Sequence, residues 1–145
     1  MTTLTVGPWN QLGPAASQVR TAVFVHEQNI PAALEWDVAD AQALHVVIRD
    51  PLAEPIATGR LLVHAPGVGR IGRMAVLSSL RGSGLGQQVL EALVQAARAR
   101  GDTEVFLHAQ TSAQGFYGRL GFTPRGDVYA EVGIPHIEMF LDIRQ

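Results

Sequence analysis

Hydrophobic and polar positions along the chain change their spacing twice, and these changes divide it into predicted elements. A short strand is predicted over Leu4-Thr5-Val6, and a helix over roughly Ala15 to Glu27, where apolar residues recur at helical spacing. Two β-type runs follow, Leu44 to Ile48 and Pro55 to Val63, with a proline-containing acidic turn between them. A third run, Arg70 to Leu77, completes an antiparallel meander.

The second half of the chain changes to alternating helices and strands. Apolar residues at spacings of three and four predict a long amphipathic helix from Leu85 to Gly101. It is followed by a strand over Val105 to Ala109, a short helix over Ser112 to Leu120 and a final strand over His136 to Ile143. Since a strand-helix-strand crossover is parallel and a meander is antiparallel, the predicted α+β or α/β fold contains a mixed sheet. Without a repeat or linker, residues 1–145 are expected to form a single domain.

Composition and charge narrow the possible functions. A net charge of −2 gives no basic footprint for nucleic acid. The absence of cysteine excludes a disulfide framework, a thiolate zinc site and a cysteine nucleophile, and the five histidines lack close ligand spacing, so no metal is expected. No signal segment or membrane-length apolar run is present, so a cytoplasmic protein without a membrane partner is expected. The acidic stretch from Glu35 to Asp40 is expected to be an exposed loop or a frayed helix.

A glycine-rich turn, Arg81-Gly82-Ser83-Gly84-Leu85-Gly86, lies between a predicted strand and the long helix. Free backbone N-H groups and the positive end of the helix dipole attract an anion there, and glycines let the backbone approach it closely. The turn is not a P-loop, because Gln87-Gln88 replaces Lys-Ser/Thr, and Gln87 or Val89 breaks the dinucleotide fingerprint. A pyrophosphate cradle is therefore predicted; the alternative is a glycine-rich helix start that holds no ligand.

This turn and four further segments together resemble a known family. Arg81, Gly84 and Gly86 match the pattern Arg/Gln-x-x-Gly-x-Gly/Ala of the GNAT superfamily of N-acetyltransferases. The chain is most similar to the ElaA-type branch of that superfamily, from about residue 19 to 140. The segments that carry this further resemblance are Val23–Gln28, Ile71–Val76, Phe116–Phe122 and Gly133–Met139.

The resemblance implies a fold and a cofactor. The fold is a GNAT-type mixed, mostly antiparallel central sheet of six to seven strands, flanked by helices and splayed between the fourth and fifth strands. The cofactor is acetyl-CoA, as acetyl donor, with its pantetheine arm in the split. The residues expected to bind it are Met74, Ala75, Val76, Arg81, Gly82, Ser83, Gly84, Leu85, Gly86, Gln87, Gln110 and Tyr117.

The implied reaction transfers acetyl to a primary amine by direct attack in a ternary complex, which needs a proton donor for the departing thiolate and a base for the amine. The resemblance makes Tyr117 the candidate acid, and a core tyrosine is the alternative. Glu27, Glu131 and His136 are candidate bases, with a solvated acid or a structural histidine as the alternatives. The predicted catalytic residues are thus Tyr117, Glu27 and His136, and the predicted acceptor-binding residues are Glu27, Arg73, Glu131 and His136.

The acceptor is expected to be a small-molecule or peptidic amine. Acidic residues at 35, 37, 40 and 131 would favour a cationic amine, although such a run is often only a solvated loop. Ala32 and Val132 depart from residues that are common in relatives, so an acceptor pocket different from theirs is expected. A non-catalytic acyl-CoA-binding sensor or scaffold and a transferase for longer acyl chains are the alternative functions. A homodimer through an exposed final strand is also considered.

Overall fold

The computed structural model describes residues 1–144, which build a seven-stranded sheet in the order β1-β2-β3-β4-β5-β7-β6. Neighbouring strands are antiparallel except β4 and β5, which are parallel. This arrangement confirms the predicted mixed, mostly antiparallel sheet. The strands are β1 (Thr3–Pro8), β2 (Leu44–Arg49), β3 (Pro55–Ala65), β4 (Val68–Val76), β5 (Glu104–Gln110), β6 (Thr123–Glu131) and β7 (Ile134–Asp142).

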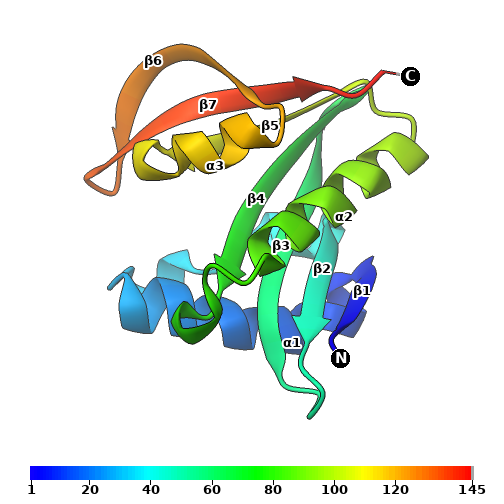
Figure 1. Ribbon diagram of the computed structural model, residues 1–145, viewed down its shortest axis with the longest axis vertical. Helices are drawn as coiled ribbons and strands as arrows, with labels where there is room; N and C mark the ends of the chain where they lie inside the picture. Colours follow the sequence, from blue (N-terminus) through cyan, green and yellow to red (C-terminus); the bar gives the residue numbers. More distant parts are fainter. Residues whose placement is uncertain (145) are drawn as a thin grey trace.

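Helices cover the two halves of the sheet differently (Figure 1). Helix α1 (Trp9–Arg20) continues into a π-helical segment, η1 (Thr21–Glu27), and lies against β2, β3 and β4. Helix α2 (Leu85–Ala99) covers the other face of these strands, and α3 (Gln114–Arg119) packs against β5 and β6. None of the helices within residues 1–144 is long and apolar enough to cross a membrane. Four short 3₁₀ segments complete the chain: η2 (Ala32–Leu34), η3 (Val38–Gln42), η4 (Ser78–Leu80) and η5 (Thr111–Ala113).

Side chains of β2 point alternately to the two faces of the sheet, so they pack against α2 on one face and α1 on the other. Val46 and Ile48 face α2, whereas Val47 packs with the apolar side of α1. Gly59 of β3 lets α2 approach the sheet closely, because a Cβ at this position would come within 2.7 Å of Val89. The long amphipathic helix was therefore predicted correctly, and its apolar side is buried against the sheet.

The sheet divides between β4 and β5. These strands share only three residue pairs, from Val68↔Glu104 to Arg70↔Phe106, and the pairing stops there. Beyond this point, residues 71–76 of β4 and 107–110 of β5 are not paired with each other. The predicted splay between the fourth and fifth strands is therefore confirmed. A break in the register between β3 and β4 sets two residues of β4, Arg73 and Met74, opposite one residue of β3, and Arg73 has a φ of 49°. This β-bulge redirects the edge of β4 at the opening of the split.

Three expectations about individual elements are corrected by the structure. The first helix begins at Trp9 rather than at Ala15, because Pro14 lies on its solvent side, where water can satisfy the carbonyl that loses a partner. Strand β6 was not predicted at all. The final strand β7 lies between β5 and β6, so it has no free edge through which a dimer could form.

The acidic stretch after α1 is also different from the expectation of an exposed loop. It follows η2 and enters η3, and two of its carboxylates are buried: Glu35 is 7% exposed and Asp40 is 1% exposed. Arg20 of α1 and Arg60 of β3 bind these two acids, and charged side chains are buried only when they are paired in this way. The stretch is therefore an ordered part of the structure.

Candidate functional site

The split between β4 and β5 opens into a cleft of about 520 Å³. Residues of η1, β4, β5, α3 and the β6–β7 hairpin line it, so segments distant in the sequence meet there. In Figure 1 the turn of this hairpin and the end of η1 lie on the same side of the molecule, at the left of the view. The polar and sulfur-containing residues that line the cleft are Gln28, Glu35, Arg60, Arg70, Arg73, Met74, His108, Gln110, Tyr117, Glu131 and His136.

Tyr117 reaches the cleft from α3. Its hydroxyl contacts the sulfur of Met74 at 3.8 Å, beside the bulge in β4, and its ring packs edge-on against Phe116 and Phe122. Burial raises the pKa of Tyr117 to about 12, because the phenolate would lose its hydration. The hydroxyl therefore keeps its proton at neutral pH and can donate it to a strong acceptor in the cleft.

His136 opens onto the cleft from β7, near the hairpin. Its Nδ1 lies 2.7 Å from the carbonyl oxygen of Ile134, which can only accept a hydrogen bond, so Nδ1 carries the proton. In the neutral ring Nε2 then holds a lone pair, and it lies 3.5 Å from a carboxylate oxygen of Glu131. The ring also stacks on Tyr129 with a centroid distance of 5.9 Å. His136 is 8% exposed, so packing fixes its orientation.

His108 is a cleft residue that the sequence analysis missed. It lies on β5, its Nδ1 is hydrogen-bonded to the hydroxyl of Tyr129, and its Nε2 is 3.9 Å from Glu138. Burial and the nearby charge of Arg70 lower its pKa, which favours the neutral ring. The alternation of β5 could have indicated it, because His108 shares a face of the strand with Gln110.

The glycine turn lies outside the lining of this cleft, at the start of α2. Gly82 and Gly84 have φ values of 82° and 89°, which residues with a Cβ rarely adopt. Gly84 is the N-cap residue and no side chain caps the helix, so its first N-H groups are free of side-chain partners. A Cβ at either glycine would meet nothing within 4 Å, which leaves open space over the turn. These features fit a diphosphate group.

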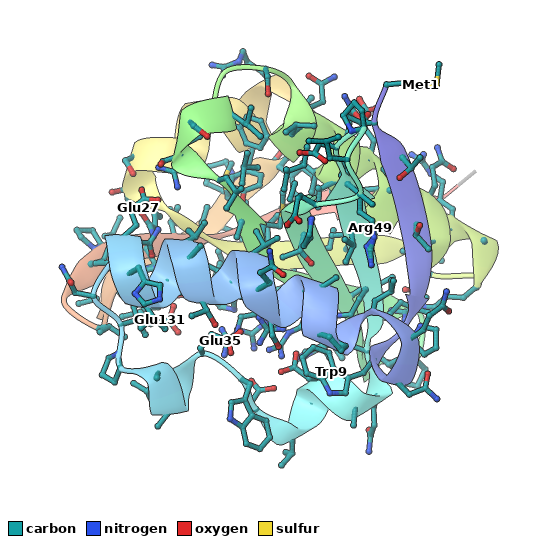
Figure 2. The ribbon with its side chains drawn as sticks, turned by 90° about the horizontal axis from the view of Figure 1, so that it is seen from below. Met1, Trp9, Glu27, Glu35, Arg49 and Glu131 are labelled. Carbon is teal, nitrogen blue, oxygen red and sulfur yellow. The ribbon has the colours of Figure 1, made fainter. Side chains whose placement is uncertain are left out.

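Arg81, at the start of the turn, is bound to Glu27 at the end of η1. Two hydrogen bonds join the guanidinium and the carboxylate, the longer one with 2.6 Å between Nη2 and Oε1. Hydrogen bonding to Arg81 lowers the pKa of Glu27, so this carboxylate is a weak proton acceptor. Glu27, labelled in Figure 2, lies near the cleft but does not line it.

The acidic stretch meets its counter-ions at the floor of the cleft. Asp37 binds Arg60 at 2.7 Å and Arg73 at 3.2 Å, while Arg20 binds both Glu35 and Asp40. Glu35 lies between α1 and the segment that follows it (Figure 2). Three acids and three arginines thus neutralise one another, which corrects the expectation that the acids at 35, 37 and 40 present free negative charge.

The structure sorts the predicted site residues into two groups. Inside the cleft it brings together Arg73, Met74, Gln110, Tyr117, Glu131 and His136. Outside the cleft lining lie Glu27, Ala75, Val76, Arg81, Gly82, Ser83, Gly84, Leu85, Gly86 and Gln87. In the second group, Ala75 and Val76 pair with β3. The residues of the glycine turn and Gln87 lie at the start of α2, and Glu27 forms an ion pair with Arg81.

A strand edge that splits from its parallel neighbour, with a glycine turn at the start of the following helix, defines a CoA-dependent acyltransferase fold. Residues 12–143 match the sequence model of a protein family, the acetyltransferase (GNAT) domain. The chain belongs to this family.

Individual relatives match nearly the whole chain. It is 37% identical over 128 residues to YjcF, an uncharacterized N-acetyltransferase of Bacillus subtilis, covering 88% of this chain and 90% of that protein. The crystal structure of ElaA from Escherichia coli superposes with a TM-score of 0.86 at 32% identity, covering 97% of this chain and 99% of that one. An acyl-CoA N-acyltransferase from Pseudomonas aeruginosa gives a TM-score of 0.86 at 38% identity, with the same coverage.

Proposed function

We propose that this protein transfers an acetyl group from acetyl-CoA to a primary amine by direct attack in a ternary complex in the cytoplasm. One observation carries the proposal. A protonated phenol, Tyr117, and a histidine oriented by a backbone carbonyl, His136, line the same cleft at the unpaired edge of β4. Amine acylation needs a proton donor and a proton acceptor in the same site, and the cleft supplies both.

The donor would be held by residues outside and inside the cleft. The first-turn N-H groups of α2 after Gly84 and the side chain of Arg81 suit the diphosphate of CoA. The edge of β4 from Ile71 to Val76 suits the amide-containing pantetheine arm, which can pair with it as an added strand does. Gln110 at the end of β5 can hydrogen-bond the same arm from the other wall. When bound, acetyl-CoA supplies the thioester whose C–S bond is exchanged for an amide bond.

His136 is the base that the geometry favours. Its Nδ1–H is held by the carbonyl of Ile134, so Nε2 is the atom left to take a proton from the acceptor's ammonium group, which leaves the neutral amine that attacks the thioester. Glu131 lies beside Nε2 and stabilises the imidazolium that forms. Glu27 is less suited, because its carboxylate is engaged by Arg81. Tyr117 donates its proton to the departing sulfur, and its hydroxyl is otherwise bound only weakly, by a thioether.

The test separates binding from turnover. The pure protein is titrated calorimetrically with acetyl-CoA and with CoA, and thiol release is then followed with a panel of primary amines. We expect micromolar binding of both CoA compounds and amine-dependent thiol release. Binding without release from any amine would favour a non-catalytic acyl-CoA sensor, and absence of binding would overturn the proposal.

A further inference from the structure

The charges that line the cleft do not all cancel. Glu35, Arg60 and Arg73 belong to the network of three acids and three arginines, which is neutral as a whole. Two charged residues that line the cleft remain outside that network, Arg70 on β4 and Glu131 at the end of β6. The cleft therefore presents one cation and one carboxylate that no oppositely charged arginine or acid neutralises.

The guanidinium of Arg70 lies near an aromatic ring but has no side-chain hydrogen-bond partner within residues 1–144. Its central carbon lies 6.0 Å from the ring centroid of Phe106, and no acid among the described residues forms an ion pair with it. A guanidinium offers five N-H donors in a planar fork that matches a carboxylate or a phosphate. Arg73, farther along β4, binds Asp37 through Nη2 only, and its buried Nε has no partner. This wall of the cleft thus has unused cationic donors.

Glu131 lines the same cleft as Arg70, and one of its carboxylate oxygens lies 3.5 Å from Nε2 of His136. A ligand in the cleft can therefore meet the cation of Arg70 and the Glu131–His136 pair together. A ligand that places an ammonium group against Glu131 and an anion against Arg70 would neutralise both. Neutral or purely cationic amines would leave the charge of Arg70 unpaired.

We propose that the acceptor of the transfer is an amine that also carries an anionic group, with the anion bound by Arg70 and the amine facing Glu131 and His136. This inference rests on the proposed acetyl transfer and names its acceptor class. It reverses the expectation of a purely cationic acceptor, which depended on free acids at positions that the structure shows to be neutralised. The anion can be a carboxylate or a phosphate, since both fit a guanidinium fork.

The experiment compares amines that carry an anionic group with matched amines that lack it. One pair is γ-aminobutyrate and its amide, and the other is O-phosphoethanolamine and ethanolamine. We expect a kcat/KM at least about 10-fold higher for the anionic member of one or both pairs, because a charge-assisted hydrogen bond to a guanidinium is lost in the neutral member. The pair with the larger ratio identifies the kind of anion. Equal rates within each pair, or faster neutral members, would overturn the inference while leaving the acetyl transfer intact.

Substitutions at Arg70 test whether this residue causes the preference for an anionic acceptor. Arg70→Gln is expected to remove the preference, mainly by raising KM for the anionic acceptor, and Arg70→Lys to restore part of it. Arg119→Gln is the matched control, because Arg119 is exposed on α3 and does not line the cleft. A preference that survives in Arg70→Gln would contradict the assignment.

A binding measurement keeps the inference testable if no amine is acetylated. The protein saturated with CoA is then titrated with the same two pairs by calorimetry. Tighter binding of an anionic member, lost in Arg70→Gln, would support the anion site even if the transfer itself failed. Indistinguishable heats for charged and neutral members would overturn it.

Discussion

Arg20 of α1 and Asp40 of η3 form a two-point ion pair, with 2.9 Å from Nη1 to Oδ1 and 3.0 Å from Nη2 to Oδ2, and each side chain is 1% exposed. A second arginine, Arg60 of β3, binds the same Oδ1 at 2.8 Å. The pair joins the first helix to the segment under the cleft, and Asp37 extends it to Arg73 in the β4 bulge. The shape of the cleft floor therefore depends on buried charges.

Replacement of Asp40 by Asn should destabilise the fold strongly. The amide leaves the buried guanidinium groups of Arg20 and Arg60 without their shared counter-ion, which costs about 3–5 kcal/mol of unfolding free energy. Urea denaturation measures this loss. Asp142→Asn is the control, because that carboxylate pairs with Arg144 on the surface and its removal should not change the denaturation midpoint measurably. Similar midpoints for wild type and Asp40→Asn would contradict the role of the network.

The same carboxylate should make stability depend on pH in the acid range. Burial alone would raise the pKa of Asp40, but hydrogen bonds from Arg20 and Arg60 outweigh it and lower the pKa from 3.8 to about 2. A depressed folded-state pKa contributes stability that is complete above pH 4 and is lost as pH falls toward 2, here about 2 kcal/mol. Thermal unfolding between pH 5 and 2 checks this, and Asp40→Asn should show a flatter profile than wild type.

Two glycines of the turn should respond differently to the same substitution. Gly84 has a φ of 89°, so Gly84→Ala forces a left-handed alanine at the start of α2, which costs about 1 kcal/mol and should weaken CoA binding at least 10-fold. Gly86 lies inside the helix, where a Cβ would meet Phe116 at an ordinary 3.5 Å. Gly86→Ala should therefore keep CoA affinity within about twofold and raise the melting temperature slightly. Calorimetry and thermal unfolding of both variants test the difference.

Tyr117→Phe should separate catalysis from binding. Removal of the hydroxyl takes away only a weak contact to the Met74 sulfur, so the fold and CoA affinity should be unchanged. The value of kcat should fall about 100-fold, the lower end of what a general acid contributes. Tyr129→Phe, at a tyrosine that contacts His108 and does not line the cleft, is the comparison variant. An equal kcat in wild type and Tyr117→Phe would exclude Tyr117 as the acid.

The β6–β7 turn offers a stabilising change. Val132 and Gly133 have φ values of 50° and 74°, and a β-branched residue is poorly suited to that conformation. Val132→Asn should raise the unfolding free energy by about 1 kcal/mol, since asparagine tolerates the left-handed region. Val128→Asn, at another exposed valine of the same hairpin, should bring no gain. Thermal unfolding of the two variants gives the answer.

The sequence predicted the regular parts of this fold because their signals are local. The spacing of apolar residues from Leu85 onward indicated α2, runs of β-type residues indicated β2 and β3, and alternation indicated β7. Strand β6 escaped because it is exposed along nearly its whole length and contains Pro124, Gly126 and Asp127, which are typical of turns. An edge strand of this kind carries no hydrophobic pattern.

The floor of the cleft could not be predicted from the acidic run alone. The partners of Asp40 lie 20 residues away on either side, at Arg20 and Arg60, and only the packed sheet brings them together. The sequence indicated Tyr117 and His136 through the family resemblance, but the proton position on His136 depends on a backbone carbonyl that the fold supplies. Arg70 became visible as a cleft residue only in the folded structure.

The early end of the β4–β5 pairing leaves an unpaired strand edge inside the molecule. At the periphery of a sheet, such an edge is a template on which another chain can add, and proteins protect it against aggregation. Here the edge from Ile71 to Met74 lines a cleft of about 520 Å³ instead of lying at the periphery. A ligand that pairs with the N-H and C=O groups of this edge must lie along it in an extended form, as an added strand does.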